Sequence, residues 1–210
     1  MTDIELQEEN SLAGCLSRDE FLTTMRRRII DGHDGWMVPD EQKTHFLTLH
    51  DNGYVPILSA SWDDFLYKSM PHYWLRMGII GHNTRAVVTF LCDHRKIPGL
   101  QSTFPDLFVI VGTEAKETST MIPVTSSVMI GGTEPIVSEI PFNVKDDGFV
   151  SPEVASDLIY SDMPPNVVAD LKARYGEVTI VDPIWNRDML AGDGILTRLT
   201  GHVMEGRGVR

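Results

Sequence analysis

The segment from Thr120 to Val144 constrains the fold of this 210-residue chain more than any other. Apolar residues alternate with polar ones on both sides of Gly131-Gly132, with the period of two that is typical of a β-strand. The glycine pair between the two runs favours a tight turn. We therefore predict an extended β-hairpin over residues 117–145, whose arms of about eleven residues would each reach roughly 35 Å.

This hairpin is a candidate interface with other protein subunits. Pro135 and Pro141 cannot donate a ladder hydrogen bond, so the second arm is expected to be an edge strand. No Lys or Arg occurs from Glu117 to Val144, although charged side chains, lysine above all, commonly keep an exposed edge from pairing with a neighbour. We therefore expect the edge to be covered, either by the chain's own domain or by another subunit. The apolar residues expected at the interface are Ile122, Val124, Val128, Ile130, Ile136, Ile140, Phe142 and Val144.

Helix and strand signals lie on both sides of the hairpin. Ser17 and Glu20 form an S-x-x-E capping box before apolar residues at helical spacing, which predicts a helix that ends near Asp31. Asn52-Gly53 either ends a second helix or turns a hairpin, because this dipeptide serves both purposes. Further helices are predicted over residues 40–50, 61–70, 151–158 and 165–175, and strands over residues 55–60, 107–111 and 178–181.

The stretch from residue 83 to residue 92 is also predicted to be a helix. Asn83 or Thr84 supplies an N-cap residue, and Val87, Val88 and Leu91 recur at the spacing of a helical stripe. Strands do not alternate regularly with helices along the chain, which excludes a doubly wound fold. We predict a single α+β domain over residues 1–210, in which helices of the amino-terminal half pack on a small mixed sheet with a long central hairpin.

The composition narrows the classes of partner. The formal net charge is −12, and nucleic-acid affinity comes largely from Lys and Arg, so no direct nucleic-acid partner is expected. No apolar run approaches the roughly eighteen residues that span a bilayer, so a soluble chain with no membrane partner is expected. The two cysteines, Cys15 and Cys92, suit a reducing compartment, which indicates cytoplasmic synthesis.

Six of the seven histidines fall between His33 and His94. Imidazole and carboxylate together suit zinc, iron or manganese, which makes His33, Asp34, Asp93 and His94 the candidate metal ligands. The dipeptides His33-Asp34 and His50-Asp51 resemble the diagnostic dipeptide of HD-type phosphohydrolases, which implies a metal-dependent hydrolase. That family is all-helical and uses further His and Asp residues on later helices, whereas the second half of this chain is rich in strands. We therefore assign no cofactor.

No common catalytic motif is present. G-x-G-x-x-G, G-x-x-x-x-G-K-[ST], H-E-x-x-H and G-x-S-x-G are all absent, and Cys92 is expected to be a buried structural residue rather than a nucleophile. The leading hypothesis is a structural subunit, forming a homo-oligomer within a larger particle such as a bacteriophage virion, where it would be a head-tail connector, neck or tail protein. The alternatives are a metal-dependent hydrolase with a His/Asp site and an acidic inhibitor that mimics nucleic acid.

Overall fold

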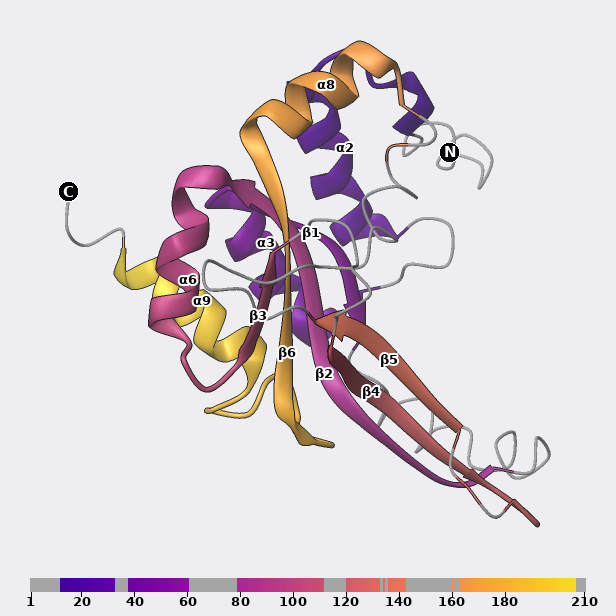
Figure 1. The fold of residues 1–210 in the computed structure, drawn as a ribbon. Coiled ribbons are helices and arrows are strands. Elements are labelled where there is room, and N and C mark those ends of the chain that lie inside the picture. Colours follow the sequence, from indigo (N-terminus) through magenta and orange to yellow (C-terminus); the bar gives the residue numbers. More distant parts are fainter. Residues whose placement is uncertain are drawn as a thin grey trace.

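The chain combines helices with an antiparallel sheet, which confirms the predicted α+β class (Figure 1). The computed structural model describes residues 12–32, 38–60, 79–111, 120–132, 134, 136–142, 160 and 163–206. The helices of this part are η1 (Leu12–Gly14), α2 (Arg18–Asp31), α3 (Asp40–Asp51), η2 (His94–Lys96), α6 (Ile97–Thr103), α8 (Pro165–Arg174) and α9 (Ile195–Glu205). Its strands are β1 (Tyr54–Ala60), β2 (Ile79–Asp93), β3 (Phe108–Val111), β4 (Thr120–Met129), β5 (Ile136–Phe142) and β6 (Tyr175–Trp185).

Strand β2 is the strand around which the sheet is organised. The strand order is β3-β6-β2-β4-β5, and β1 pairs with β2 as well. Residues 87–92 of β2 pair with both β1 and β6, whereas residues 79–84 pair with β4. Every pairing in the described part of the chain is antiparallel, where we had predicted a mixed sheet.

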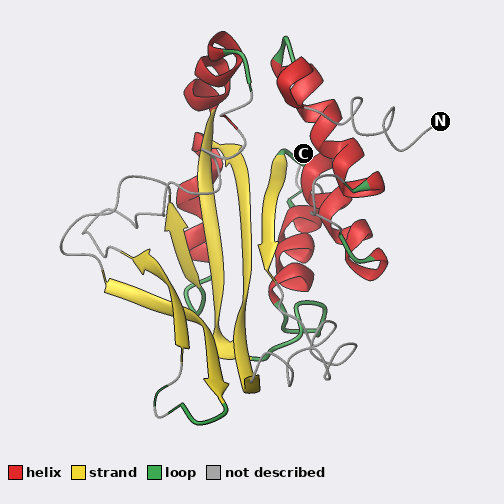
Figure 2. Ribbon diagram, turned by 90° about the vertical axis from the view of Figure 1, so that its right-hand side faces the viewer, coloured by secondary structure: helices red, strands yellow, loops and turns green. Residues whose placement is uncertain are grey.

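The two faces of the sheet are covered by different helices. Val88 and Phe90 of β2 pack with α3, α6 and α9 on one face, whereas Leu91 packs with η1, α2 and α8 on the other. Neighbouring strand residues point to opposite faces, so a strand that is covered on both sides buries all of its side chains. Figure 2 shows the helices gathered along the upper part of the sheet, while β4 and β5 extend away from them.

The predicted helix over residues 83–92 is wrong, because this stretch belongs to β2. Every residue from Ala86 to Cys92 is buried, and a strand that is buried on both faces reads as a continuous apolar run rather than an alternating one. Such a run resembles a helical stripe. Asn83 and Thr84 do not cap a helix: Asn186 accepts a hydrogen bond from the Thr84 amide at 2.9 Å and donates one to Asn83 Oδ1 at 2.8 Å.

Most of the other predicted elements are confirmed. Ser17 Oγ accepts a hydrogen bond from the amide of Glu20 at 3.2 Å, as the capping box requires, and α3 ends at the Asn52-Gly53 turn instead of continuing into a hairpin. Helix α9 was not predicted, although Ile195, Leu199 and Val203 have helical spacing. The predicted helices over residues 61–70 and 151–158 lie outside the described residues. In the described part of the chain, no helix has the length and hydropathy to cross a membrane.

Candidate functional site

The predicted hairpin is present as β4 and β5. The amide of Gly132 donates to the carbonyl oxygen of Met129 at 3.1 Å, and Gly131 has a φ of 75°, which a residue without a β-carbon adopts at little cost. In the described strand order β5 is outermost, as Pro141 predicted. We call residues 79–84 together with β4, β5 and the described residues of the turn between them the arm, and the remaining described residues the body.

The described apolar side chains of the first arm of the hairpin range from buried at its base to exposed near the turn. Ile122 is 4% exposed and packs against Val87, Ile110 and Val181 of the body. Val124 is half-buried, Val128 is 37% exposed and Ile130, in the turn, is 65% exposed. The base of the hairpin is therefore anchored to the body, whereas the described residues leave its far end uncovered.

A β-bulge changes which residues share a face at the end of the arm. Ile122 pairs with Ile140 at the base, but the register shifts between Pro123 and Thr125, after which Ser126 pairs with Val137. Directly opposed residues of an antiparallel ladder lie on the same face, so Val137, which is 41% exposed, shares a face with Ser126 and Val128. We call Val128, Ile130 and Val137 the tip patch.

Two of the eight residues predicted for the interface, Val128 and Ile130, belong to the tip patch, and its third residue, Val137, was not predicted. Val137 was missed because a bulge inserts one residue into an otherwise regular alternation, and period-two counting cannot detect this. Ile136 instead pairs with Ser127. Ile140 and Phe142 lie nearer the base, where Phe142 pairs with Thr120, and Val144 lies outside the described residues.

Arg85 joins the arm to the body. It lies where β2 changes partner, since Thr84 still pairs with Thr125 of β4 while Arg85 pairs with Trp185 of β6. Its Nη1 donates to the carbonyl oxygen of Pro123 at 3.1 Å, and its guanidinium carbon lies 4.4 Å from the centroid of the Trp185 ring. Burial lowers the pKa of Arg85, and the negative charge of Asp182 opposes this effect.

Asp182 of β6 is the acidic residue whose charge acts on Arg85. Its side chain is fully buried, and Oδ1 accepts a hydrogen bond from the amide of Ile184 at 2.8 Å. Oδ2 lies 3.4 Å from Nη1 of Arg187 and has no hydrogen-bond partner among the described residues. A buried charge is costly without an opposite charge beside it, so Arg187 is expected to stabilise this end of β6.

The two candidate metal ligands that the structure describes, Asp93 and His94, form hydrogen bonds with other protein groups. Asp93 accepts from the Arg95 side chain through both carboxylate oxygens, at 2.9 Å and 2.5 Å, and these bonds lower the pKa of Asp93. His94 donates from Nε2 to the carbonyl oxygen of Lys172 at 3.2 Å. His33 and Asp34 lie outside the described residues. No group of three or more His, Cys, Asp or Glu residues in the described ranges could hold a metal ion.

The second His-Asp dipeptide connects two helices. His50 of α3 donates from Nε2 to the carbonyl oxygen of Leu22 in α2 at 2.9 Å, and Asp51 accepts from Nε of Arg26 in α2 at 3.0 Å. These contacts account for the dipeptide through helix packing. Cys92 is buried, and burial raises its pKa to about 12, which suits a structural thiol rather than a nucleophile.

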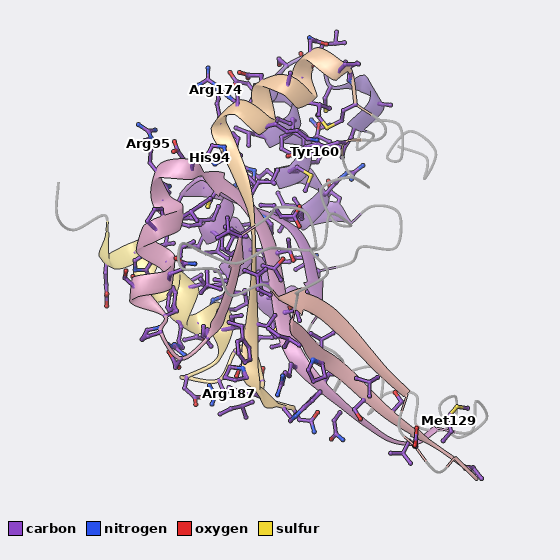
Figure 3. All side chains as sticks on the ribbon, in the orientation of Figure 1. His94, Arg95, Met129, Tyr160, Arg174 and Arg187 are labelled. Carbon is purple, nitrogen blue, oxygen red and sulfur yellow. The ribbon has the colours of Figure 1, made fainter. Side chains whose placement is uncertain are left out.

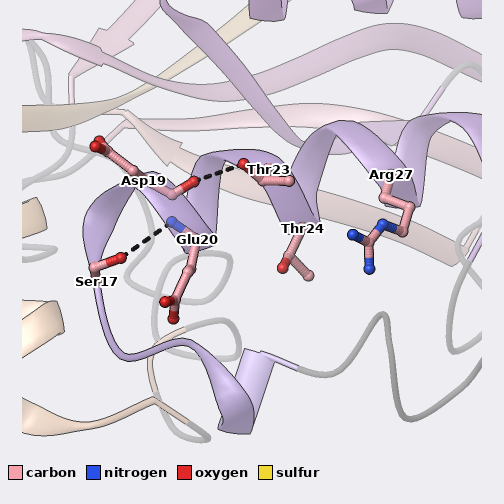
Figure 4. Close-up of a pocket in the computed structure, with 6 residues that line it drawn as sticks. All are labelled: Ser17, Asp19, Glu20, Thr23, Thr24 and Arg27. Carbon is pink, nitrogen blue, oxygen red and sulfur yellow. Dashed lines mark hydrogen bonds between the residues drawn. The ribbon is translucent and has the colours of Figure 1, made fainter.

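A hollow of about 380 Å³ lies along α2 (Figure 4). Ser17, Asp19, Glu20, Thr23, Thr24 and Arg27 line it. The hydroxyl of Thr23 donates to the carbonyl oxygen of Asp19 at 2.8 Å, and Ser17 caps the helix, so these polar groups serve the helix itself. Their arrangement indicates no catalytic role.

A second hollow, of about 350 Å³, is formed by α2, η2 and α8. We call it the basic hollow; its lining residues are Arg18, Asp93, His94, Arg95, Ala173, Arg174 and Tyr175. Each of the three arginines forms an ion pair with an aspartate: Arg18 with Asp19, Arg95 with Asp93, and Arg174 with Asp170. Figure 3 places His94, Arg95 and Arg174 at one end of the molecule and Met129, in the arm, at the other.

No protein-family model matches this chain, and no curated protein is significantly similar to it. A functional proposal therefore has to be based on the arm, on the contacts that Arg85 makes between the arm and the body, and on the basic hollow. None of them brings a nucleophile, a general base and an oxyanion-binding group together.

Proposed function

We propose that this chain is a structural subunit of a multi-protein assembly and that the arm contacts other subunits. The observation that carries the proposal is the contrast between Ile122, which is buried at the base of the arm, and Val128, Ile130 and Val137, which are exposed near its turn. The fold anchors the base of the arm and presents the apolar end. A surface of this kind gains free energy when a partner covers it.

The tip patch has the properties of an interface centre. No Lys or Arg lies near Val128, Ile130 and Val137 in the sequence, from residue 117 to residue 144, so no basic side chain there would have to be desolvated on binding. Complete burial of one such side chain contributes about 1.5–3 kcal/mol at most. Three of them would supply a useful share of an association energy, but too little to drive assembly without further contacts.

The setting that we propose is a homo-oligomer within a larger particle, specifically a bacteriophage virion, as a head-tail connector, neck or tail protein. What supports an assembly role is the projecting arm together with the lack of a catalytic constellation in the described residues. Mass spectrometry of purified particles tests the setting. The chain should be recovered in a fixed ratio to the other virion proteins, and its absence from the particles would exclude a virion role.

Self-association of the purified chain tests the arm. Sedimentation velocity over a concentration series should show oligomers for the native chain and at least about tenfold weaker association for Val128→Ser combined with Ile130→Ser. Ile184→Ser is the matched control, because Ile184 is 48% exposed on β6 in the body. A native chain that stays a compact monomer throughout, or tip and control variants that behave alike, would contradict the proposal.

A further inference from the structure

We infer that β5 of one copy pairs edge to edge with β5 of a second copy, antiparallel and about a two-fold axis at Ser138. This inference rests on the proposed function and names both the partner and the part of the arm that it contacts. In the described strand order β5 is outermost, and Figure 1 shows it on the side of β4 that faces away from β2. The outer side of β5 therefore has no partner strand among the described residues, and an unpaired edge is a template for a further strand.

Two prolines indicate which backbone groups of β5 point outward. The N–H groups of consecutive residues in a strand point alternately to its two sides, and proline is tolerated in an edge strand where its nitrogen faces away from the ladder. Pro141 therefore faces the outer side, and Val137 and Glu139, which are two and four residues before it, face the same way. Glu139 opposes Pro123 of β4, which has no N–H to donate and whose carbonyl oxygen accepts from Arg85 at 3.1 Å. The outer edge thus presents the N–H and C=O groups of Val137 and Glu139.

The positions of these groups favour a register centred on Ser138. In this register Val137 of each copy pairs with Glu139 of the other, and the two pairs exchange about four main-chain hydrogen bonds. A register centred on Glu139 would put two like charges directly opposite each other, which destabilises a sheet. A register centred on Val137 would extend the ladder to Pro135, which has no N–H and precedes β5 in the sequence. The register centred on Ser138 keeps the ladder within β5.

The composition of β5 suits pairing with a second copy of itself. No Lys or Arg occurs from residue 117 to residue 144, so the side chains that most often keep two edges apart are missing. Each copy carries a net charge of −12, so two copies associate best where charge is sparse, and Glu139 is the only charged residue of β5. The two-fold register also places Ile136 opposite Ile140 of the second copy, and it gives Val137, which is 41% exposed, a cross-strand neighbour. A two-fold contact of this kind is self-complementary and closes as a dimer.

Cross-linking through single introduced cysteines tests the register. Ser138→Cys brings two thiols together on the two-fold axis, at a non-hydrogen-bonded position where the Cα atoms lie about 4.5 Å apart, within the range of a disulfide. Val137→Cys is the matched control, because its two cysteines would lie on the diagonal with Cα atoms about 7–8 Å apart, too far for a disulfide. Under mild oxidation, Ser138→Cys should give at least about tenfold more covalent dimer than Val137→Cys. The native thiols of Cys15 and Cys92 are buried, so they should not contribute.

A proline substitution tests the main-chain hydrogen bonds. Glu139→Pro removes one outward N–H from each copy but none that β5 gives to β4, so urea denaturation should show that the fold is retained. Glu139→Ala is the control, because it removes the same side chain and keeps the N–H. In sedimentation velocity, Glu139→Pro should associate at least about tenfold more weakly than Glu139→Ala. Equal association of the two variants would overturn the edge contact, and if Glu139→Pro fails to fold, the cross-linking decides.

The outcomes separate this inference from the proposed function. If Val128→Ser combined with Ile130→Ser abolishes association while Ser138→Cys gives no more dimer than Val137→Cys, the arm is an interface through its tip, and the pairing of β5 is overturned. Preferential cross-linking of Val137→Cys would overturn the register centred on Ser138. A native chain that is monomeric throughout overturns both ideas.

Discussion

One strand, β2, passes through two different environments along its 15 residues. From Ala86 to Cys92 it lies between β1 and β6, and helices or apolar side chains cover both faces. In residues 79–84 it pairs with β4 instead, and the apolar side chains at the end of the arm are exposed. Backbone pairing is present in both regions, whereas the apolar side chains are buried in the first and exposed at the end of the second. The stability of the fold is therefore expected to reside in the body, and the arm is left available for association.

The largest expected difference in stability is between the same substitution, isoleucine to alanine, made in the body and made at the tip. Ile180 is fully buried in the body and Ile130 is 65% exposed at the tip. Ile180→Ala should lower the free energy of unfolding by about 4 kcal/mol through lost burial and a residual cavity, and Ile130→Ala by less than about 0.5 kcal/mol. Urea denaturation measures both values. Equal losses would show that the tip is packed as tightly as the body.

Removing the counter-charge of Asp182 should have the next largest effect. Arg187→Met leaves a fully buried carboxylate without its closest positive partner, which should cost about 3 kcal/mol of stability. Adding Asp182→Asn keeps the shape and the Oδ1 acceptor while removing the charge, so the double variant should regain part of the loss. If the double variant is less stable than Arg187→Met alone, the buried charge is not the cause.

A substitution at the joint should act on the arm more than on the body. Arg85→Met removes the hydrogen bond to Pro123 and the contact with the Trp185 ring, a loss of about 2 kcal/mol. Hydrogen exchange should report faster exchange in β4 and little change in β6. Arg26→Met is the control, because Arg26 pairs with Asp51 far from the arm. Equal acceleration in both strands would mean that arm and body unfold together.

The smallest expected effect comes from an ion pair within the body. Hydrogen bonds from Arg198, at 2.7 Å, hold the pKa of Asp106 below its usual range. The folded pKa is lower than the unfolded value of about 4, so the pair stabilises the fold above that pH and the contribution is lost as the pH falls through the folded pKa.

Asp106→Asn should therefore cost no more than about 1 kcal/mol at pH 7, because the pair is partly exposed, and progressively less as the pH falls through the folded pKa of Asp106. Urea titrations of both proteins across this range measure the difference. If the difference in unfolding free energy between the two proteins increases as the pH falls, the ion pair is not its cause. The arm cannot form such a pair with its own residues, since no Lys or Arg occurs from residue 117 to residue 144.

Sequence patterns predicted the structure where the conformation of a segment depends mainly on residues that are close in sequence. The N-cap of α2, the turn at Gly131 and the strand conformation of β4 depend on neighbours in sequence, and all three were predicted correctly. The regular alternation predicted along β4 was wrong, because a bulge interrupts it between Pro123 and Thr125. The strand β2 was mistaken for a helix because burial on both faces removes the alternation that identifies a strand. Its burial comes from distant segments, such as β6, about ninety residues away in sequence.

Some features of the candidate site could likewise be predicted from the sequence, and others are visible only in the tertiary structure. Alternating apolar residues without basic neighbours predicted the hairpin and most of its apolar surface. The bulge that brings Val137 beside Val128, the contact between Arg85 and Trp185, and the meeting of Arg18, Arg95 and Arg174 could not be read from the sequence. The sequence by itself determined that a hairpin forms, because strand alternation is a local property. Only the tertiary structure decided which end of it is covered, because burial depends on contacts between segments that are far apart in the chain.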